Sequence, residues 1–294
     1  MDRVAELTEL QRDLLAWAEV ARRDLPWRRT RDPWAVLVSE LMLQQTQVPR
    51  VLARFEPFLA QFPTPAACRA AAVGEVVAAW SGLGYNRRAV NLHRCAVVVC
   101  ERYDGRMPND LDALRALPGI GPYTARAVLV FAYERDIGLV DTNAGRFVAR
   151  ALAGEPVPAK RAQLLADSVV PAGHGWAWGQ AVFDLGASVC TKRDPSCERC
   201  PIAQHCAWRR AGWPAPDPIR GSAGISASQS TFQGSFRQGR GRLLARLTAG
   251  PVATDALAAA TGWPDDSVRA ASAAESLVTD GLAVRRDDGS LALP

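Results

Sequence analysis

Four cysteines near residue 200 have the residue type and the spacing of a metal centre. They follow the pattern Cys-x6-Cys-x2-Cys-x5-Cys, at Cys190, Cys197, Cys200 and Cys206. Thiolates are soft ligands that suit zinc or an iron–sulfur cluster, and structural zinc usually uses two close Cys-x2-Cys pairs. Only one such pair is present, so the spacing favours a loop that wraps a larger [4Fe–4S] cluster, with zinc and two disulfides as the alternatives.

Two carboxylates could share acid and base chemistry. Asp141 precedes a helical pattern, where a capping aspartate is commonplace and where the helix end favours the ionised form. Glu40 lies on the apolar face of the segment 36–44, so burial should raise its pKa unless it pairs with an arginine. A neutral acid and an anionic carboxylate could protonate a leaving group and stabilise a sugar cation.

Two short motifs could bind a nucleic acid. Gly119 and Gly121 lie in a Leu-Pro-Gly-x-Gly-Pro turn between helical patterns, and their N–H groups can bind an anion such as phosphate. An ordinary turn between two helices is the alternative. Gln44 and Gln45 follow Glu40 in the run Gln-Gln-Thr-Gln, whose amides can bond to base edges.

The elements that must position these residues are helices. Leu7, Leu10, Leu14 and Trp17 form an amphipathic stripe, and Asp32-Pro33 is a helix start. Helical patterns recur near residues 50–61, 74–82, 86–103, 110–116, 122–133, 142–152, 160–170 and 175–188. No alternating strands interrupt them, so the main body is predicted to be all-α.

Composition changes after Trp213. Residues 213–238 are rich in Pro, Gly, Ser and Gln and are expected to form a linker. Helical patterns return near 243–247, 254–261 and 265–280, and residues 282–293 alternate around an Asp-Gly turn, which indicates a hairpin. The tail 239–294 is therefore expected to resemble a small winged helix, with a helical cap on the main body as the alternative.

Composition limits the class of protein. The 294 residues carry a net charge of +5, which is a modest indication of a polyanionic partner. No signal peptide and no apolar stretch long enough to span a bilayer is visible, so we expect a cytoplasmic protein without a membrane partner. Only Lys160 and Lys192 are lysines, which leaves few amines that could act as nucleophiles.

Taken together and in their order along the chain, these motifs resemble the helix-hairpin-helix DNA glycosylases that carry an iron–sulfur cluster, and within them the MutY-type adenine glycosylases, over roughly residues 8–210. The resemblance implies two helical domains with a DNA cleft between them. Residues 1–27 plus 135–212 would form the cluster domain, and residues 28–134 a six-helix domain. The tail is short for the Nudix-like domain of many family members.

The resemblance also implies roles for individual residues. Glu40 would protonate adenine, and Asp141 would stabilise the sugar cation or trap it covalently, with Tyr123 and Asn143 assisting. DNA and base contacts would come from Arg28, Gln44, Gln45, Leu83, Tyr85, Gly119, Gly121, Lys192 and Arg193. The four cysteines would hold one [4Fe–4S] cluster.

The implied activity is monofunctional removal of adenine opposite 8-oxoguanine or guanine, by a nucleoid-associated monomer. Bifunctional relatives carry a lysine after the hairpin proline, where this chain has Tyr123, so little or no strand cleavage is expected. A thymine or uracil mismatch glycosylase of the same fold and a non-catalytic DNA-binding module are the alternatives. The pairing of Glu40 with Gln-Gln-Thr-Gln favours adenine over thymine or uracil as the base, and the presence of both carboxylates argues against a non-catalytic module.

Overall fold

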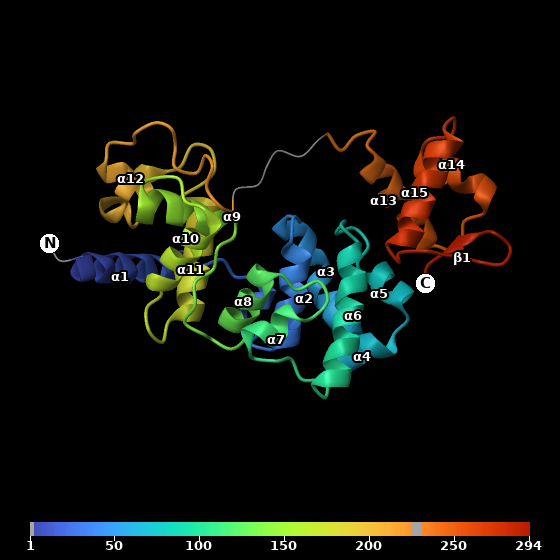
Figure 1. The fold of residues 1–294 in the computed structure, drawn as a ribbon, viewed down its shortest axis with the longest axis horizontal. Coiled ribbons are helices and arrows are strands. Elements are labelled where there is room, and N and C mark those ends of the chain that lie inside the picture. Colours follow the sequence, from blue (N-terminus) through green and yellow to red (C-terminus); the bar gives the residue numbers. More distant parts are fainter. Residues whose placement is uncertain (1–2, 225–230) are drawn as a thin grey trace. The chain divides into compact units, whose positions relative to one another are not determined.

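The structure, a computed structural model, describes residues 3–224 and 231–294. The chain divides into two compact units. The first unit comprises Met1–Val36, Asn109–Leu111 and Gly121–Ser228, and the second comprises Leu37–Pro108, Asp112–Ile120 and Gln229–Pro294. Helices make up nearly all regular structure in both units, as Figure 1 shows, so the predicted all-α body is confirmed.

The first unit is built around the packing of α1 (Arg3–Ala21) and α9 (Thr142–Phe147) against α11 (Gly175–Ser188). Its other elements are η1 (Pro26–Arg28), α8 (Pro122–Phe131), the π-helical segment η2 (Val148–Ala153), α10 (Ala159–Ser168), η3 (Cys197–Arg199), η4 (Ala203–His205) and α12 (Ala207–Arg210). One apolar core is formed mainly by α1, α9, η2, α10 and α11, and it includes Leu14, Phe147 and Leu185.

The second unit begins within α2 (Pro33–Leu43), which crosses the boundary between the units. It continues through α3 (Val48–Gln61), α4 (Pro65–Ala70), α5 (Val73–Ala79), α6 (Arg87–Arg102) and most of α7 (Leu111–Arg115). The sequence patterns predict every one of these helices except α4, whose N-cap Thr64 accepts a hydrogen bond from the Ala67 amide at 3.1 Å. Six residues are too few to show a clear apolar period.

The tail folds within the second unit. It contains α13 (Phe236–Leu247), η5 (Thr254–Ala256), α14 (Leu257–Thr261), α15 (Ser267–Thr279) and an antiparallel hairpin of β1 (Val284–Arg285) and β2 (Leu291–Ala292). The predicted helices and hairpin are therefore confirmed. The tail contacts the helices before it, because the Gly74 amide donates to the Pro294 carbonyl at 2.8 Å and Asp280 lies 3.6 Å from Arg87.

The interval expected to be a linker includes ordered contacts. The Ala223 amide donates to the Val157 carbonyl at 2.9 Å, and the Ser222 hydroxyl accepts from the Val157 amide at the same distance. Residues 225–230 of that interval, and residues 1–2 of the expected cluster domain, lie outside the described residues. No helix in the described ranges has the length and apolar character needed to cross a membrane.

Candidate active site

Asp141 is the N-cap of α9. Its Oδ1 accepts hydrogen bonds from the backbone amides of Asn143 at 2.8 Å and Ala144 at 2.7 Å, and its Oδ2 accepts from the Asn143 side-chain amide at 3.0 Å. The extended backbone of Asp141 turns its side chain back over the first turn of the helix, as capping requires. The carboxylate is thus fixed in one orientation by three donors.

The electrostatics of Asp141 result from two opposing effects. Burial raises the pKa of its carboxyl above the ordinary value, whereas the hydrogen bonds from Ala144 and Asn143 and the charge of Arg146 lower it by less. The helix end therefore reduces, without outweighing, the cost of removing this carboxylate from water. A carboxylate held at such a cost is reactive toward a nearby positive charge.

Two neighbouring residues of α11 position two of the expected site residues. Phe183 lies under Tyr123, with ring centroids 6.5 Å apart and an angle of 29° between the rings. The next residue, Asp184, is buried and accepts two hydrogen bonds from the Arg28 guanidinium, at 2.7 and 3.0 Å. Arg23 adds a third guanidinium bond to Asp184 at 2.6 Å. The pKa of Asp184 is lowered, because these arginine contacts outweigh burial.

The same helix presses against Asn143. A Cβ on Gly186 would lie 2.6 Å from the Asn143 Cβ, so only glycine fits at this position. Arg146 continues the contact, since its Nη2 donates to the Asn143 side-chain oxygen at 2.7 Å and its Nε donates to the Cys190 carbonyl at 2.7 Å. A chain of hydrogen bonds therefore joins Asp141 to the backbone of the first cysteine.

Glu40 and the glutamines lie in the second unit. Glu40 is in α2, 6% exposed, among the buried apolar residues of that helix. The helix ends three residues later, and Gln45 takes a left-handed conformation with φ of 54°. Gln45 is exposed, whereas Gln44 is half-buried. The turn thus directs one of the two expected base-contacting amides toward solvent.

The loop before α6 carries Leu83 and Tyr85. Leu83 is only 2% exposed, and Tyr85 is 42% exposed with a left-handed φ of 47°. Gly82 and Gly84 also have positive φ, so three of the four residues from 82 to 85 have a positive φ, and Leu83 is the exception. Gln45, Leu83 and Tyr85 are all expected to contact the duplex; Gln45 and Tyr85 project outward, whereas Leu83 packs inward.

The hairpin glycines have different backbone requirements. Gly119 has φ of 76°, and a Cβ there would lie 2.7 Å from the Asn91 Cβ, so the turn needs glycine. Gly121 is the extended N-cap of α8, is exposed, and has open space around its Cα. Gly121 therefore leaves the first amides of α8 without a side chain over them, as an anion site requires.

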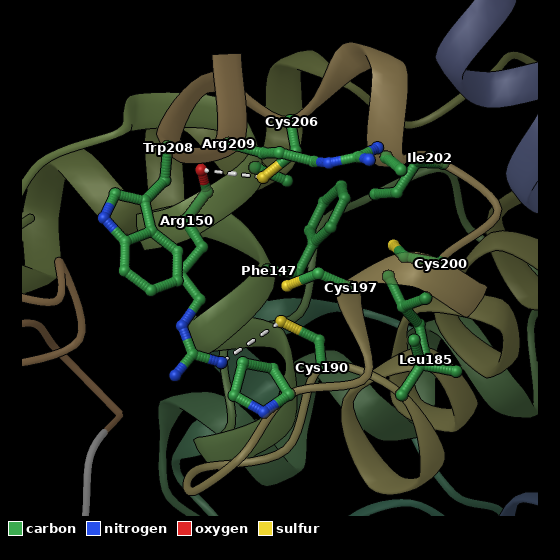
Figure 2. Close-up of a pocket in the computed structure, with 14 residues that line it drawn as sticks. Phe147, Arg150, Leu185, Cys190, Cys197, Cys200, Ile202, Cys206, Trp208 and Arg209 are labelled. Carbon is green, nitrogen blue, oxygen red and sulfur yellow. Dashed lines mark hydrogen bonds between the residues drawn. The ribbon is translucent and has the colours of Figure 1, made fainter. Parts of the chain in front are cut away.

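The four cysteines line one pocket, with Phe147 and Leu185 among the other residues around it (Figure 2). The pocket holds about 430 Å³ of space, part of it open to solvent. Burial raises the pKa of the Cys200 thiol to about 12 and also raises the pKa values of Cys190 and Cys206. Metal binding would replace the protons on these thiols. Within residues 3–224 and 231–294, no three His, Cys, Asp or Glu side chains form a group that could hold a single metal ion.

Arg150 lies beside the cysteine pocket. Its Nη1 donates to the Cys190 sulfur at 3.5 Å and to the Thr191 carbonyl at 2.7 Å, as Figure 2 shows for the sulfur contact. Its Nη2 pairs with Asp217 at 2.6 Å. This arginine therefore connects the first cysteine, the exposed loop that carries Lys192 and Arg193, and the segment after the cysteines.

Sequence reasoning missed Arg146, Arg150, Phe183, Gly186 and Asp217 as part of the site. Arg146 and Arg150 are one helical turn apart, so their shared face was visible in the sequence. Their partners were not, because Cys190 and Asp217 are 40 or more residues away along the chain. Two arginines on the buried face of a short helix are the signal that could have found them.

Comparison with known proteins defines the class of this fold and site. Residues 38–171 match the HhH-GPD superfamily of base excision DNA repair proteins. The solved structure of a thermostable thymine-DNA glycosylase superposes with a TM-score of 0.65 and 28% identity, over 70% of this chain and 98% of that one. The fold is that of the helix-hairpin-helix glycosylases.

Relatives of higher identity narrow the class. The adenine DNA glycosylase of Mycobacterium tuberculosis (strain CDC 1551 / Oshkosh) is 43% identical over 292 residues, which cover 96% of this chain and 92% of that protein. The adenine DNA glycosylase of Mycolicibacterium smegmatis is 41% identical over 285 residues, which cover 96% and 94%. The chain belongs to the adenine DNA glycosylase family of the HhH-GPD superfamily, and it is a DNA glycosylase of base excision repair.

Proposed function

We propose that this enzyme hydrolyses the N-glycosidic bond of adenine mispaired with 8-oxoguanine or guanine in double-stranded DNA. The observation that carries the proposal is the arrangement along α11, which contacts Arg28, Tyr123 and Asn143 while Asn143 holds Asp141. These are four of the residues to which we assign roles in this chemistry. The identity to adenine DNA glycosylases over 96% of the chain supports adenine as the base.

The reaction divides between the two carboxyl groups. Glu40 delivers a proton to adenine N7, so that the electron pair of the C1′–N9 bond leaves with the base. The positive charge that develops on the sugar is stabilised by Asp141, or is trapped as a bond between C1′ and its carboxylate. Water then supplies the hydroxyl group at C1′ and displaces the Asp141 carboxylate where that bond has formed. The proton that water loses restores the Glu40 carboxyl, and the products are adenine and an apurinic site.

The remaining residues bind DNA. Arg28, oriented by Asp184, would lie beside the extruded adenine. Gln44, Gln45, Leu83 and Tyr85 would act where the base leaves the stack, with the exposed Tyr85 entering the duplex. Amides at Gly119 and Gly121, and the exposed Lys192 and Arg193, would meet phosphates.

The cysteine pocket fits a [4Fe–4S] cluster, which we propose as the cofactor. Four thiols line one pocket from separate points of a loop, as a group with four metal corners requires. Arg150 places a positive charge beside the sulfur of Cys190, which suits an anionic thiolate. When bound, the cluster would crosslink the loop, and the chain's own residues would carry out the hydrolysis. A [4Fe–4S] protein should be brown, whereas a zinc protein is colourless.

We also propose that the enzyme is monofunctional. Tyr123 follows Pro122 at the start of α8, and both lysines of the chain, Lys160 and Lys192, are exposed on the first unit. Borohydride added during base release should therefore trap no covalent adduct between protein and DNA, because trapping needs a Schiff base. A trapped adduct in wild-type protein that persists in Tyr123→Phe would contradict the proposal.

A panel of mismatched duplexes tests the substrate. Single-turnover assays should show adenine release opposite 8-oxoguanine that is faster than opposite guanine, and no release of thymine or uracil opposite guanine. The similarity to the thymine-DNA glycosylase structure makes release of thymine or uracil opposite guanine the alternative activity. Release of thymine without release of adenine would replace the proposal. We further propose that the enzyme acts as a cytoplasmic, nucleoid-associated monomer.

A further inference from the structure

Arg88 closes the end of α2 from another helix. It is the second residue of α6 and is 8% exposed. Its Nη1 donates to the carbonyls of Leu41, Met42 and Gln44, the last two at 3.0 and 2.6 Å. Carbonyls at the end of a helix have no partner within the helix and carry its negative dipole end, so a guanidinium satisfies both their bonds and their charge.

The other side of the same guanidinium binds the loop before α6. Its Nη2 donates to the Gly84 carbonyl at 2.8 Å, and its Nε donates to the Tyr85 carbonyl at 3.2 Å. Thr46 completes the connection, because its hydroxyl accepts from Nη2 at 3.0 Å and donates to the Leu83 carbonyl at 3.1 Å. One planar group therefore joins two loops that lie about 40 residues apart in the sequence.

Both loops contain backbone conformations that need such support. Gln45 and Tyr85 have φ of 54° and 47°, a region that costs an ordinary residue about 1 kcal/mol or more. The carbonyls of Gln44 and Gly84, immediately before them, are both bound by Arg88. Such conformations persist only when surrounding contacts fix them, and they gather at functional positions.

The site is specific for arginine. Every acceptor named above is a neutral oxygen, and the guanidinium also faces the rings of Trp80 and Tyr85 at 5.4 and 5.5 Å. Burial lowers the pKa of Arg88 to about 10, so the group stays charged near neutrality. A lysine keeps the charge, but its single nitrogen cannot donate to both loops as the fork of arginine does.

We propose that Arg88 is a positioning residue that holds the Gln45 turn and the Tyr85 loop in one fixed relation, so that both side chains engage the duplex together as the adenine is extruded. This inference rests on the proposed function of those two loops. Arg88 touches no substrate in this scheme and acts through their backbones. Its loss should affect unstacking of the base more than affinity for DNA.

The test separates unstacking from chemistry. In an Asp141→Asn background, a duplex with 2-aminopurine beside the target adenine reports unstacking by its fluorescence on binding. We expect Arg88→Lys and Arg88→Met to bind this duplex within about threefold of the parent, while the equilibrium for unstacking falls about tenfold, or 1.4 kcal/mol. Thr46→Val should also lower the equilibrium for unstacking, but by less than the Arg88 variants do. Full unstacking in both Arg88 variants would overturn the proposal.

A control and a second substrate exclude general damage to the fold. Arg102→Met, an exposed position at the far end of α6, should leave unstacking unchanged. With Asp141 intact, Arg88→Lys should slow adenine release about tenfold on the paired duplex and much less when the adenine lies opposite an abasic site. Equal slowing on both substrates would overturn the positioning role. Failure of the wild-type enzyme to release adenine would instead refute the proposed function.

Discussion

At the scale of single residues, the site holds Asp141 and Asp184 in buried positions, where loss of contact with water disfavours a charged carboxylate. Asp141 is held by three hydrogen-bond donors at a helix start, yet burial still raises its pKa. Asp184 shows the opposite balance, because Arg23 and Arg28 lower its pKa. The charge of Asp141 is therefore costly, whereas the charge of Asp184 is neutralised, and in the proposed mechanism only Asp141 is available to a developing cation.

Substitution of Asp141 by asparagine should separate activity from stability. Asparagine caps helices as well as aspartate does but carries no charge, so base release should fall at least about hundredfold. A raised pKa in the folded protein means that ionisation costs folding free energy above that pKa and nothing below the unfolded value. The unfolding free energy of the variant minus that of the wild type should therefore become more positive as the pH rises from about 3 to 7.

Denaturant titrations across this pH range measure that difference. Asp266→Asn is the matched control, because Asp266 caps α15 through a 2.9 Å bond from the Arg269 amide and lies far from the site in sequence. The control should leave base release unchanged. A difference that falls with rising pH would show that the pKa of Asp141 is lowered.

At the scale of elements, local sequence predicted most of what the structure contains. The helix starting after Asp141, the hairpin turn at Gly119 and the cysteine loop each depend on residues close together in the chain, so their signals are complete in a short window. The roles of Arg88, Arg150 and Asp217 depend on partners about 40 to 70 residues away. A pattern within one window carries no information about such partners.

Helix α11 gives a test of how closely the site is packed. Gly186→Ala would place a methyl group 2.6 Å from the Asn143 Cβ, so Asn143 or the helix must shift. Overpacking of this kind costs about 1–3 kcal/mol of stability, and a small displacement of Asn143 should slow base release about tenfold or more. Single-turnover rates and thermal midpoints measure both effects.

The neighbouring exposed residue provides the control for α11. Ala187→Ser adds one atom on the solvent side of the same helix and should change neither the rate nor the midpoint. A normal rate in Gly186→Ala would show that Asn143 tolerates the displacement, and it would remove Asn143 from the group of residues that assist Asp141.

At the scale of the whole molecule, each unit has its own core, and the cysteine pocket belongs to the first. Cys190, Cys200 and Cys206 pack against the core formed by α1, α9, η2, α10 and α11. Cys95 lies instead in the core of the second unit, on α6. Loss of whatever fills the cysteine pocket should therefore weaken one unit and leave the other intact.

Hydrogen exchange in protein with and without the proposed cluster measures this division. Cys200→Ser, or chelation of the iron, should abolish the absorbance near 400 nm. Because metal binding is coupled to the folding of the loop that supplies the ligands, the amides of α9, η2 and α11 should then exchange faster. The amides of α4 and α6 should keep their protection from exchange. Cys95→Ala is the control for the second unit. A cavity at this buried position should speed the exchange of amides in α6 and leave those of α9 and α11 unchanged. Unchanged exchange in the cluster-free protein would mean that the packed side chains alone hold the first unit together, and equal loss of protection in both units would mean that their cores unfold as one.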